Sequence, residues 1–420
     1  MAKCSSDIDR RVRAVSAPRL PLACLHGELS STSRGHVNSF PPRSAVAESG
    51  SSSGQVSEAG RPHVAQRDRL YEIDALRITA AVSVVIYHYV FSAYAGGVSK
   101  VGFPVGSEIA RFGYLGVDMF FMISGFVVLL SAWNRRPGAF LVSRIVRLYP
   151  AFWVAVTITA LVSVTLSMGK YPITLVQYLA NLTMFNSLPD IPNVDVVYWT
   201  LWAEIRFYAL VFVLAWIGIT RSRVVRVLWG WLALTFLLQS GVLPAPVRSV
   251  ADLVVQSQFS HYFIAGMALC LVYRFGLSAQ LAAIVLISFG NAVYRGIEFA
   301  GKVGARYHTE IESSVVVTVI VAIFIVLFLV SLRVTRRLGR PWFAVAGALT
   351  YPLYLIHAHI GFVIFDRLGG VVQWHVLLVG MVALMCLAAY AIHTLVERPL
   401  APLLKRFLTP DLRSAGWRRG

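Results

Sequence analysis

The stretch Tyr71-Glu-Ile-Asp-Ala-Leu-Arg-Ile-Thr-Ala-Ala-Val-Ser-Val-Val-Ile-Tyr-His-Tyr-Val90 is apolar enough to enter a bilayer, yet it carries Asp74, Arg77 and His88. In a helix that turns about 100° per residue, Arg77 and His88 share one face and lie roughly 16 Å apart along the axis. Ionisable side chains inside a membrane helix are costly and usually face a protein interior or a wet cavity. We therefore expect a membrane helix with a functional polar face.

The composition of the chain indicates an integral membrane protein. Hydrophobic residues make up 57% of the 420 residues and charged residues only 14%, with a mean hydropathy of +0.67, which exceeds what a soluble domain can bury. The net charge of +18 comes from Lys and Arg gathered in the N-terminal segment and in alternate loops. The positive-inside rule explains this pattern better than nucleic-acid binding does. The four cysteines form no CxxC pair, so we expect no metal site and no disulfide framework.

The apolar residues divide the chain into three regions. Residues 1–70 are rich in Ser, Gly, Pro and Arg and are expected to form a disordered cytoplasmic tail. Residues 71–400 are expected to form an all-α polytopic membrane domain with about ten transmembrane helices, followed by a basic cytoplasmic tail at 401–420. A shorter apolar run at 172–185 is expected to be interfacial or re-entrant. We place the spans at residues 73–94, 112–132, 148–168, 200–219, 224–240, 260–273, 278–292, 313–332, 343–365 and 374–395.

The charges in the loops predict the orientation in the membrane. With a cytoplasmic N-terminus, the loops expected outside hold few cations, and this asymmetry favours an even number of spans with both termini inside. This orientation places Arg77 near the cytoplasmic surface and His88 in the outer half of its helix. The loops expected inside hold Arg135, Arg136, Arg144, Arg147, Arg221, Arg223, Arg226, Arg333, Arg336, Arg337, Arg340, Lys405 and Arg406.

Two further spans carry an acidic residue. Asp118 lies in otherwise apolar sequence, where it is either a functional carboxylate or an interfacial one that pairs with a cation such as Arg111. Glu204 lies one helical turn before Tyr208, among tryptophans that alone would form an interfacial belt. Both carboxylates are therefore candidates for the polar interior that the first helix predicts.

An arginine pair and a histidine pair complete the candidates. Arg144 and Arg147 are three residues apart at the start of a span and would project from one face, which suits phosphate binding, although ordinary positive-inside topology explains them as well. His357 and His359 are two residues apart and point to different helix faces, which is a poor spacing for a metal pair. One of them could face the same cavity as His88 while the other hydrogen-bonds a backbone carbonyl. Pro352 is expected to kink this span.

Five motifs occur in a fixed order along residues 71–400. They are Asp74-Ala-Leu-Arg77 followed after ten residues by His88, Gly116-Val-Asp-Met-Phe-Phe-Met-Ile-Ser-Gly-Phe126, Arg144-Ile-Val-Arg147-Leu-Tyr-Pro, Trp199-Thr-Leu-Trp-Ala-Glu204-Ile-Arg-Phe-Tyr208 and Tyr351-Pro-Leu-Tyr-Leu-Ile-His357. Together they resemble the acyltransferase-3 family of bacterial membrane acyltransferases, which modify polysaccharides, lipo-oligosaccharides, peptidoglycan and some macrolide sugars.

The resemblance implies a multi-pass protein of the bacterial inner membrane that takes acyl-coenzyme A from the cytoplasmic side and transfers the acyl group to a hydroxyl. Arg77 and His88 match the essential Arg-x10-His pair of the family, and Arg144 with Arg147 matches its Arg-x-x-Arg motif, which is associated with the donor. Arg206 departs from the acidic or amide residues usual after the motif glutamate, which puts local acceptor contacts in doubt. No further domain follows the last span, so we expect a stand-alone acyltransferase.

These observations predict a membrane O-acyltransferase with one site that runs from a cytoplasmic mouth to a buried base. His88 would act as general base on the hydroxyl of a carbohydrate or glycolipid of the cell envelope, with Asp118 or Glu204 orienting its ring. Arg77 and the Arg-x-x-Arg pair would bind the donor, which we expect to be acetyl-CoA, with no permanently bound cofactor. We favour direct attack over an acyl-enzyme because no motif places Ser or Cys beside a base.

Two alternatives remain open at this stage. The first is a proton-coupled secondary transporter in which His88, Asp118 and Glu204 form a proton relay; an internal hydropathy repeat would favour it, and none is visible between the two halves. The second is an enzyme of the same fold that transfers a longer or dicarboxylic acyl group, such as succinyl.

Overall fold

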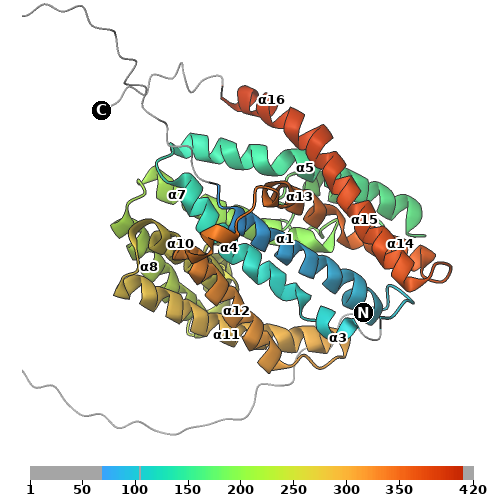
Figure 1. The fold of residues 1–420 in the computed structure, drawn as a ribbon, viewed down its shortest axis with the longest axis horizontal. Coiled ribbons are helices and arrows are strands. Elements are labelled where there is room, and N and C mark those ends of the chain that lie inside the picture. Colours follow the sequence, from blue (N-terminus) through green and yellow to red (C-terminus); the bar gives the residue numbers. More distant parts are fainter. Residues whose placement is uncertain (1–68, 104–105, 410–420) are drawn as a thin grey trace, which may run out of the picture. The chain divides into compact units, whose positions relative to one another are not determined.

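The computed structural model describes residues 69–103 and 106–409, and every regular element in these ranges is a helix (Figure 1). Eight of the helices described there are long and apolar enough to cross a membrane. The prediction of an all-α polytopic membrane protein is therefore confirmed. The tail predicted at 1–70 lies outside the described residues except for Arg69 and Leu70, as do residues 410–420 of the predicted C-terminal tail.

Each of the ten predicted spans coincides with a helix or with helices joined end to end. Shorter elements connect them: α3 (Ser107–Ala110), α6 (Leu175–Leu182), η3 (Val196–Tyr198), α9 (Ala245–Val255) and η4 (Val334–Leu338). The ten are α1 (Tyr71–Ile86) with η1 (Tyr87–Ser92) and α2 (Ala93–Ala95), η2 (Gly113–Leu115) with α4 (Gly116–Ala132), α5 (Pro137–Leu166), α7 (Trp199–Trp216), α8 (Arg221–Gln239), α10 (Ser260–Phe275), α11 (Ala279–Tyr307), α12 (Ser313–Ser331), α13 (Phe343–Ile356) with α14 (Ala358–Leu368), and α15 (Trp374–Ile392) with η5 (His393–Glu397) and α16 (Arg398–Leu408).

Two of the predicted spans, α8 and α10, are not among the eight membrane-crossing candidates. The first turns of α8 carry Arg221, Arg223 and Arg226, and α10 has only 16 residues. Every residue of α10 from Ser260 to Val272 is buried, because α4, α8, α11 and α12 pack around it. A helix that is apolar on all sides and enclosed by other helices does not need to face lipid. Helix α10 is therefore a core element of the described region.

Two glycines bring α4 and α10 into close contact. A Cβ atom on Gly266 would lie 2.0 Å from the carbonyl oxygen of Met122, and a Cβ on Gly125 would lie 2.4 Å from the carbonyl oxygen of Phe263. Only a residue without a side chain fits at either position, which is the usual way in which membrane helices approach closely.

The helix that opens the membrane domain lies between α4 and α13 (Figure 1). A Cβ on Gly116 of α4 would meet the carbonyl oxygen of Ala80 at 2.6 Å, and a Cβ on Gly347 of α13 would meet the Asp74 carboxylate at 2.5 Å. Helices α8, α10, α11 and α12 lie on one side of this central group, and α5, α14, α15 and α16 lie on the other (Figure 1). The carboxylates of Glu72 and Asp74 on α1 are thus held inside the protein.

The connection between α5 and α7 contains a short helix. The run at 172–185 forms the short helix α6, which begins after Thr174, whose hydroxyl accepts the N–H of Gln177 at 3.1 Å. Its eight residues are too few to span a membrane, in agreement with the prediction.

Helix α13 continues through Pro352 to Ile356, so the kink expected at Pro352 stays a prediction, and the helix breaks at His357, before α14. The hydrogen bond that Pro352 cannot make is the one to the carbonyl four residues earlier, so the proline does not account for a break at His357. The hydroxyl of Tyr89 donates to the carbonyl oxygen of His357 at 2.8 Å, and the N–H of His359 donates to the Asp195 carboxylate at 3.0 Å. Contacts from η1 and from the segment before α7 therefore fix the break.

Candidate active site

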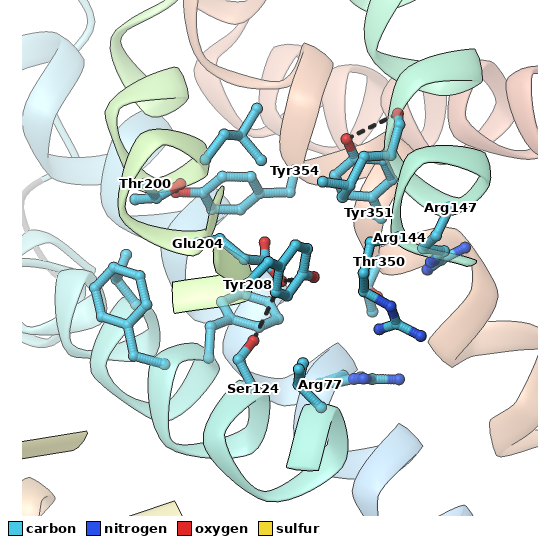
Figure 2. Close-up of a pocket in the computed structure, with 16 residues that line it drawn as sticks. Arg77, Ser124, Arg144, Arg147, Thr200, Glu204, Tyr208, Thr350, Tyr351 and Tyr354 are labelled. Carbon is cyan, nitrogen blue, oxygen red and sulfur yellow. Dashed lines mark hydrogen bonds between the residues drawn. The ribbon is translucent and has the colours of Figure 1, made fainter. Parts of the chain in front are cut away.

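Two cavities divide the six residues that the sequence singled out. The first, here called the arginine pocket, has an empty volume of ≈ 810 Å³ and includes Arg77, Arg144, Arg147 and Glu204 in its lining (Figure 2). The second, here called the histidine cavity, has an empty volume of ≈ 1380 Å³ and includes His88 and Asp118. The residues that were expected to form a single site are therefore divided between two cavities.

The two cavities share a boundary. The side chains that line both are those of Val117 on α4 and Tyr354 on α13. The hydroxyl of Tyr354 lies 3.0 Å from that of Thr200, which in turn donates to the carbonyl oxygen of Val197 at 2.9 Å. Tyr354 is therefore held in place between Arg77 on one side and His88 on the other.

The arginine pocket has an excess of positive charge. Figure 2 shows the guanidinium groups of Arg77, Arg144 and Arg147 on the same side of the pocket. Arg77 lies 3.5 Å from the Asp74 carboxylate, and Arg147 lies 3.5 Å from the carboxylate of Glu397. Both distances leave the guanidinium groups able to bind an anionic ligand as well.

Arg144 is held by aromatic rings. Its guanidinium carbon lies 5.7 Å from the ring centroids of both Phe140 and Tyr208, within cation–π range. Among the described residues, it has no carboxylate partner within ion-pair distance. Arg77 and Arg147 each lie near a carboxylate, whereas Arg144 has only aromatic contacts and no salt bridge within the described residues. Its guanidinium group is therefore the one in this pocket best placed to bind a phosphate.

Glu204 is the acidic side chain among the described residues that line the arginine pocket. It accepts hydrogen bonds from the hydroxyl of Tyr208, one turn along α7, and from that of Ser124 on α4 at 3.3 Å. The one-turn spacing expected between Glu204 and Tyr208 therefore produces a direct contact. Ser124 is conspicuous in the sequence as a polar residue in an apolar span. Thr200 and Tyr354 belong to two of the five motifs, but their residue types alone did not mark them as lining residues.

His88 lies in η1, a π-helical segment, and is 9% exposed. π-Helical turns within α-helices frequently occur at functional sites. Its Nδ1 lies 2.9 Å from the carbonyl oxygen of Val84 and 3.1 Å from Nε2 of His357. The ring also packs edge-on against Tyr87 and beside Phe362. The sequence suggested that one histidine of the His357/His359 pair faces the cavity of His88 while the other bonds a backbone carbonyl. Neither histidine belongs to the cavity lining, and His357 both bonds the carbonyl oxygen of Tyr354 at 2.8 Å and contacts the His88 ring.

Asp118 lines the same cavity as His88, but its hydrogen-bond partner comes from another helix. It accepts a hydrogen bond from the hydroxyl of Tyr262 on α10 at 3.0 Å. Arg111, the alternative partner considered from sequence, instead pairs with Glu108 and donates to the carbonyl oxygen of Glu310 at 3.0 Å. No hydrogen bond joins His88 to either candidate carboxylate within the described part of the chain. That Asp118 or Glu204 orients the His88 ring therefore stays a prediction, and no contact in the described residues supports it.

Arg206, the departure from the family pattern, lies outside both cavities. Its guanidinium carbon lies 5.2 Å from the ring of Trp202, and the group donates to the carbonyl oxygen of Asp252 at 3.4 Å. This arginine therefore contacts the segment that precedes α10 and not the residues that line either cavity.

Comparison with known proteins agrees with the motif order. A family model of the acyltransferase-3 type, described as an acyltransferase domain, matches residues 70–394. The peptidoglycan O-acetyltransferase OatA of Listeria monocytogenes is 31% identical over 99 residues, which correspond to 22% of this chain and 13% of OatA. The match thus spans only a small part of that relative. No solved structure matches the chain significantly.

Proposed function

We propose, because this chain belongs to the acyltransferase-3 family, that it transfers an acyl group from acyl-coenzyme A to a hydroxyl of a carbohydrate or glycolipid. The acyl group is expected to be acetyl, and the location the cytoplasmic membrane of a bacterium. The observation that carries the proposal is the juxtaposition of an arginine pocket and a buried histidine cavity across one shared boundary.

The arginine pocket suits the donor. Coenzyme A carries phosphate groups, and the planar guanidinium group binds phosphate through two parallel hydrogen bonds. Arg77 lies near the start of α1 and Arg144 near the start of α5, which the predicted orientation places at the cytoplasmic surface. Acyl-coenzyme A is a cytoplasmic metabolite, so the charged head of the donor would stay at this surface while its thioester end reaches inward.

The histidine cavity suits the acceptor. In the proposed step, Nε2 of His88 takes the proton of the acceptor hydroxyl as its oxygen attacks the thioester carbonyl carbon. The new carbon–oxygen bond forms, the carbon–sulfur bond breaks, and the coenzyme A thiolate takes the proton from the imidazolium. Neutral imidazole is the side chain best suited to this exchange near neutral pH. Arg77 would bind a phosphate or the thioester end of the donor in the arginine pocket, and Asp118 and Glu204 are proposed to stabilise charge in their respective cavities.

The experiment uses membranes that hold the protein and its natural envelope acceptors. We expect label from radioactive acetyl-CoA to enter a non-protein envelope fraction, and mass spectrometry of surface glycans to show an acetyl increment that disappears when the protein is removed. Incorporation from succinyl-CoA in place of acetyl-CoA would redirect the proposal to a dicarboxylic acyl group. Incorporation from neither donor would contradict the acyltransferase proposal and favour the transporter alternative.

Arg144→Lys tests the donor site. Lysine keeps the charge but loses the paired donors and the flat aromatic contacts, so the KM for the donor should rise about three- to tenfold while kcat changes little. Arg147→Lys should have a smaller effect because Arg147 already pairs with Glu397. Arg226→Lys, on α8 and away from both cavities, is the matched control. An unchanged KM in Arg144→Lys would leave this arginine with a topological role only.

A further inference from the structure

We propose that His357 is a positioning residue for His88, so that a second neutral histidine holds the catalytic base where a carboxylate would be expected. The inference rests on the proposed function, because it assigns a partner to the base of that reaction. It follows from the hydrogen bonds of the two rings, which come from η1 and from the break between α13 and α14.

The hydrogen bonds determine where the protons lie. Nδ1 of His357 lies 2.8 Å from the carbonyl oxygen of Tyr354, and Nδ1 of His88 lies 2.9 Å from that of Val84. A carbonyl oxygen can only accept, so both Nδ1 atoms carry hydrogen. In neutral His357, Nε2 then holds a lone pair, and it lies 3.1 Å from the Nδ1 of His88. Nδ1–H of His88 is therefore shared between Val84 and His357.

This arrangement leaves Nε2 of His88 as its basic nitrogen. Since Nδ1 carries the hydrogen, Nε2 of the neutral ring holds the lone pair, and the ring belongs to the lining of the histidine cavity. A rotated ring would place Nδ1–H in the cavity and lose two hydrogen bonds. His357 thus selects the tautomer and the orientation that general-base chemistry requires.

The backbone holds His357 firmly. His357 is fully buried, and its carbonyl oxygen accepts from the hydroxyl of Tyr89 at 2.8 Å. Two residues later, the N–H of His359 donates to the buried Asp195 carboxylate at 3.0 Å, and that carboxylate also accepts the N–H of Val197 at 3.1 Å. The helix break is thereby fixed to both η1 and η3.

The chemistry of the partner differs from that of a carboxylate. When His88 takes the acceptor proton on Nε2, its Nδ1–H bonds to Val84 and His357 become charge-assisted and strengthen. His357 neither gains nor loses a proton, and the proton on Nε2 of His88 passes to the departing thiolate. A neutral partner stabilises the imidazolium less than a buried carboxylate would, so the proton is released more readily to the leaving group.

The test compares three variants in lipid nanodiscs. His357→Phe keeps a ring of similar size but no acceptor, and should lower kcat about 10- to 100-fold while the KM of the donor changes little. His357→Gln places a side-chain oxygen within reach of Nδ1–H of His88 and should restore most of the rate. His375→Phe, the same exchange at an exposed position on α15, is the control and should leave the rate unchanged.

A second measurement does not depend on activity. In ¹⁵N spectra of histidine-labelled protein, His88 should appear as a neutral ring with hydrogen on Nδ1, and His357→Phe should shift this signal whereas His375→Phe should not. Hydrogen on Nε2 of His88, or a signal unaffected by His357→Phe, would overturn the proposal, as would equal loss of kcat in His357→Phe and His357→Gln. If the spectra are as expected but the protein shows no acyl transfer, the proposed function is contradicted while the hydrogen-bonded pair of His88 and His357 is supported.

Discussion

Replacing His88 with alanine is expected to reduce acyl transfer by about 10²- to 10⁴-fold, the range usual for loss of a general base. The variant removes the nitrogen that takes the hydroxyl proton, and His357, the histidine next to it, is fully buried and does not line the histidine cavity. The loss should fall on kcat. The measurement is the initial rate of acyl transfer by purified protein in nanodiscs, with donor and acceptor each varied.

Donor binding separates this result from misfolding. The arginine pocket does not include His88, so coenzyme A should bind the variant with unchanged affinity in calorimetry. Alanine leaves Nε2 of His357 without its partner, and such an unsatisfied buried group costs about 1–3 kcal/mol of stability. His88→Gln, which retains polar atoms, therefore accompanies His88→Ala as a second inactive variant. Transfer at the wild-type rate by a well-folded His88→Ala protein would remove His88 from the mechanism.

Replacing Gly266 with valine is expected to prevent stable folding. The first added carbon would lie 2.0 Å from the carbonyl oxygen of Met122 and 2.9 Å from the backbone nitrogen of Phe126. These are backbone atoms of α4, so the clash cannot be relieved by a side-chain rotation, and the cost should exceed the roughly 1–3 kcal/mol typical of overpacking. Size-exclusion chromatography and thermal unfolding in detergent should show aggregated or strongly destabilised protein.

Gly290 provides the matched control for this substitution. It lies on α11, also within a helix, but a Cβ there would meet no atom within 4 Å. Gly290→Val should therefore unfold at nearly the wild-type temperature. Equal stability of the two variants would mean that α4 and α10 are not in the close contact described here. Because Asp118 and Ser124 lie on α4, Gly266→Val should also disrupt both cavities.

The helices were largely predictable, but their lengths were not. Apolar runs of spanning length have a strong signal, so all ten predicted spans coincide with helices. The run at 278–292, however, belongs to a helix that continues to Tyr307. Glu298 pairs with Arg295 one turn before it and with Lys302 one turn after it, and such pairs support a helix beyond its apolar part. Hydropathy alone does not detect this extension.

The residues of the candidate site were predictable, whereas their partners were not. Arg77 and His88 were conspicuous because charged or titratable groups are rare in apolar sequence. Their assignment to different cavities depends on Val117 and Tyr354, which look like ordinary residues of apolar helices. His88 and His357 are 269 positions apart, and Asp118 and Tyr262 are 144 apart. Contacts at such separations depend on tertiary packing, which a single sequence does not encode in any local pattern.

The boundary formed by Val117 and Tyr354 has a consequence for the cell. In the orientation predicted from the loop charges, the arginine pocket would face the cytoplasm and the histidine cavity the opposite side of the membrane. An open passage between them would let ions leak and dissipate the electrochemical gradient on which the cell depends. A tyrosine anchored to Thr200 can close that passage to ions while only the reactive end of the donor reaches across. Activated acyl groups would thereby become available in a compartment that contains no coenzyme A.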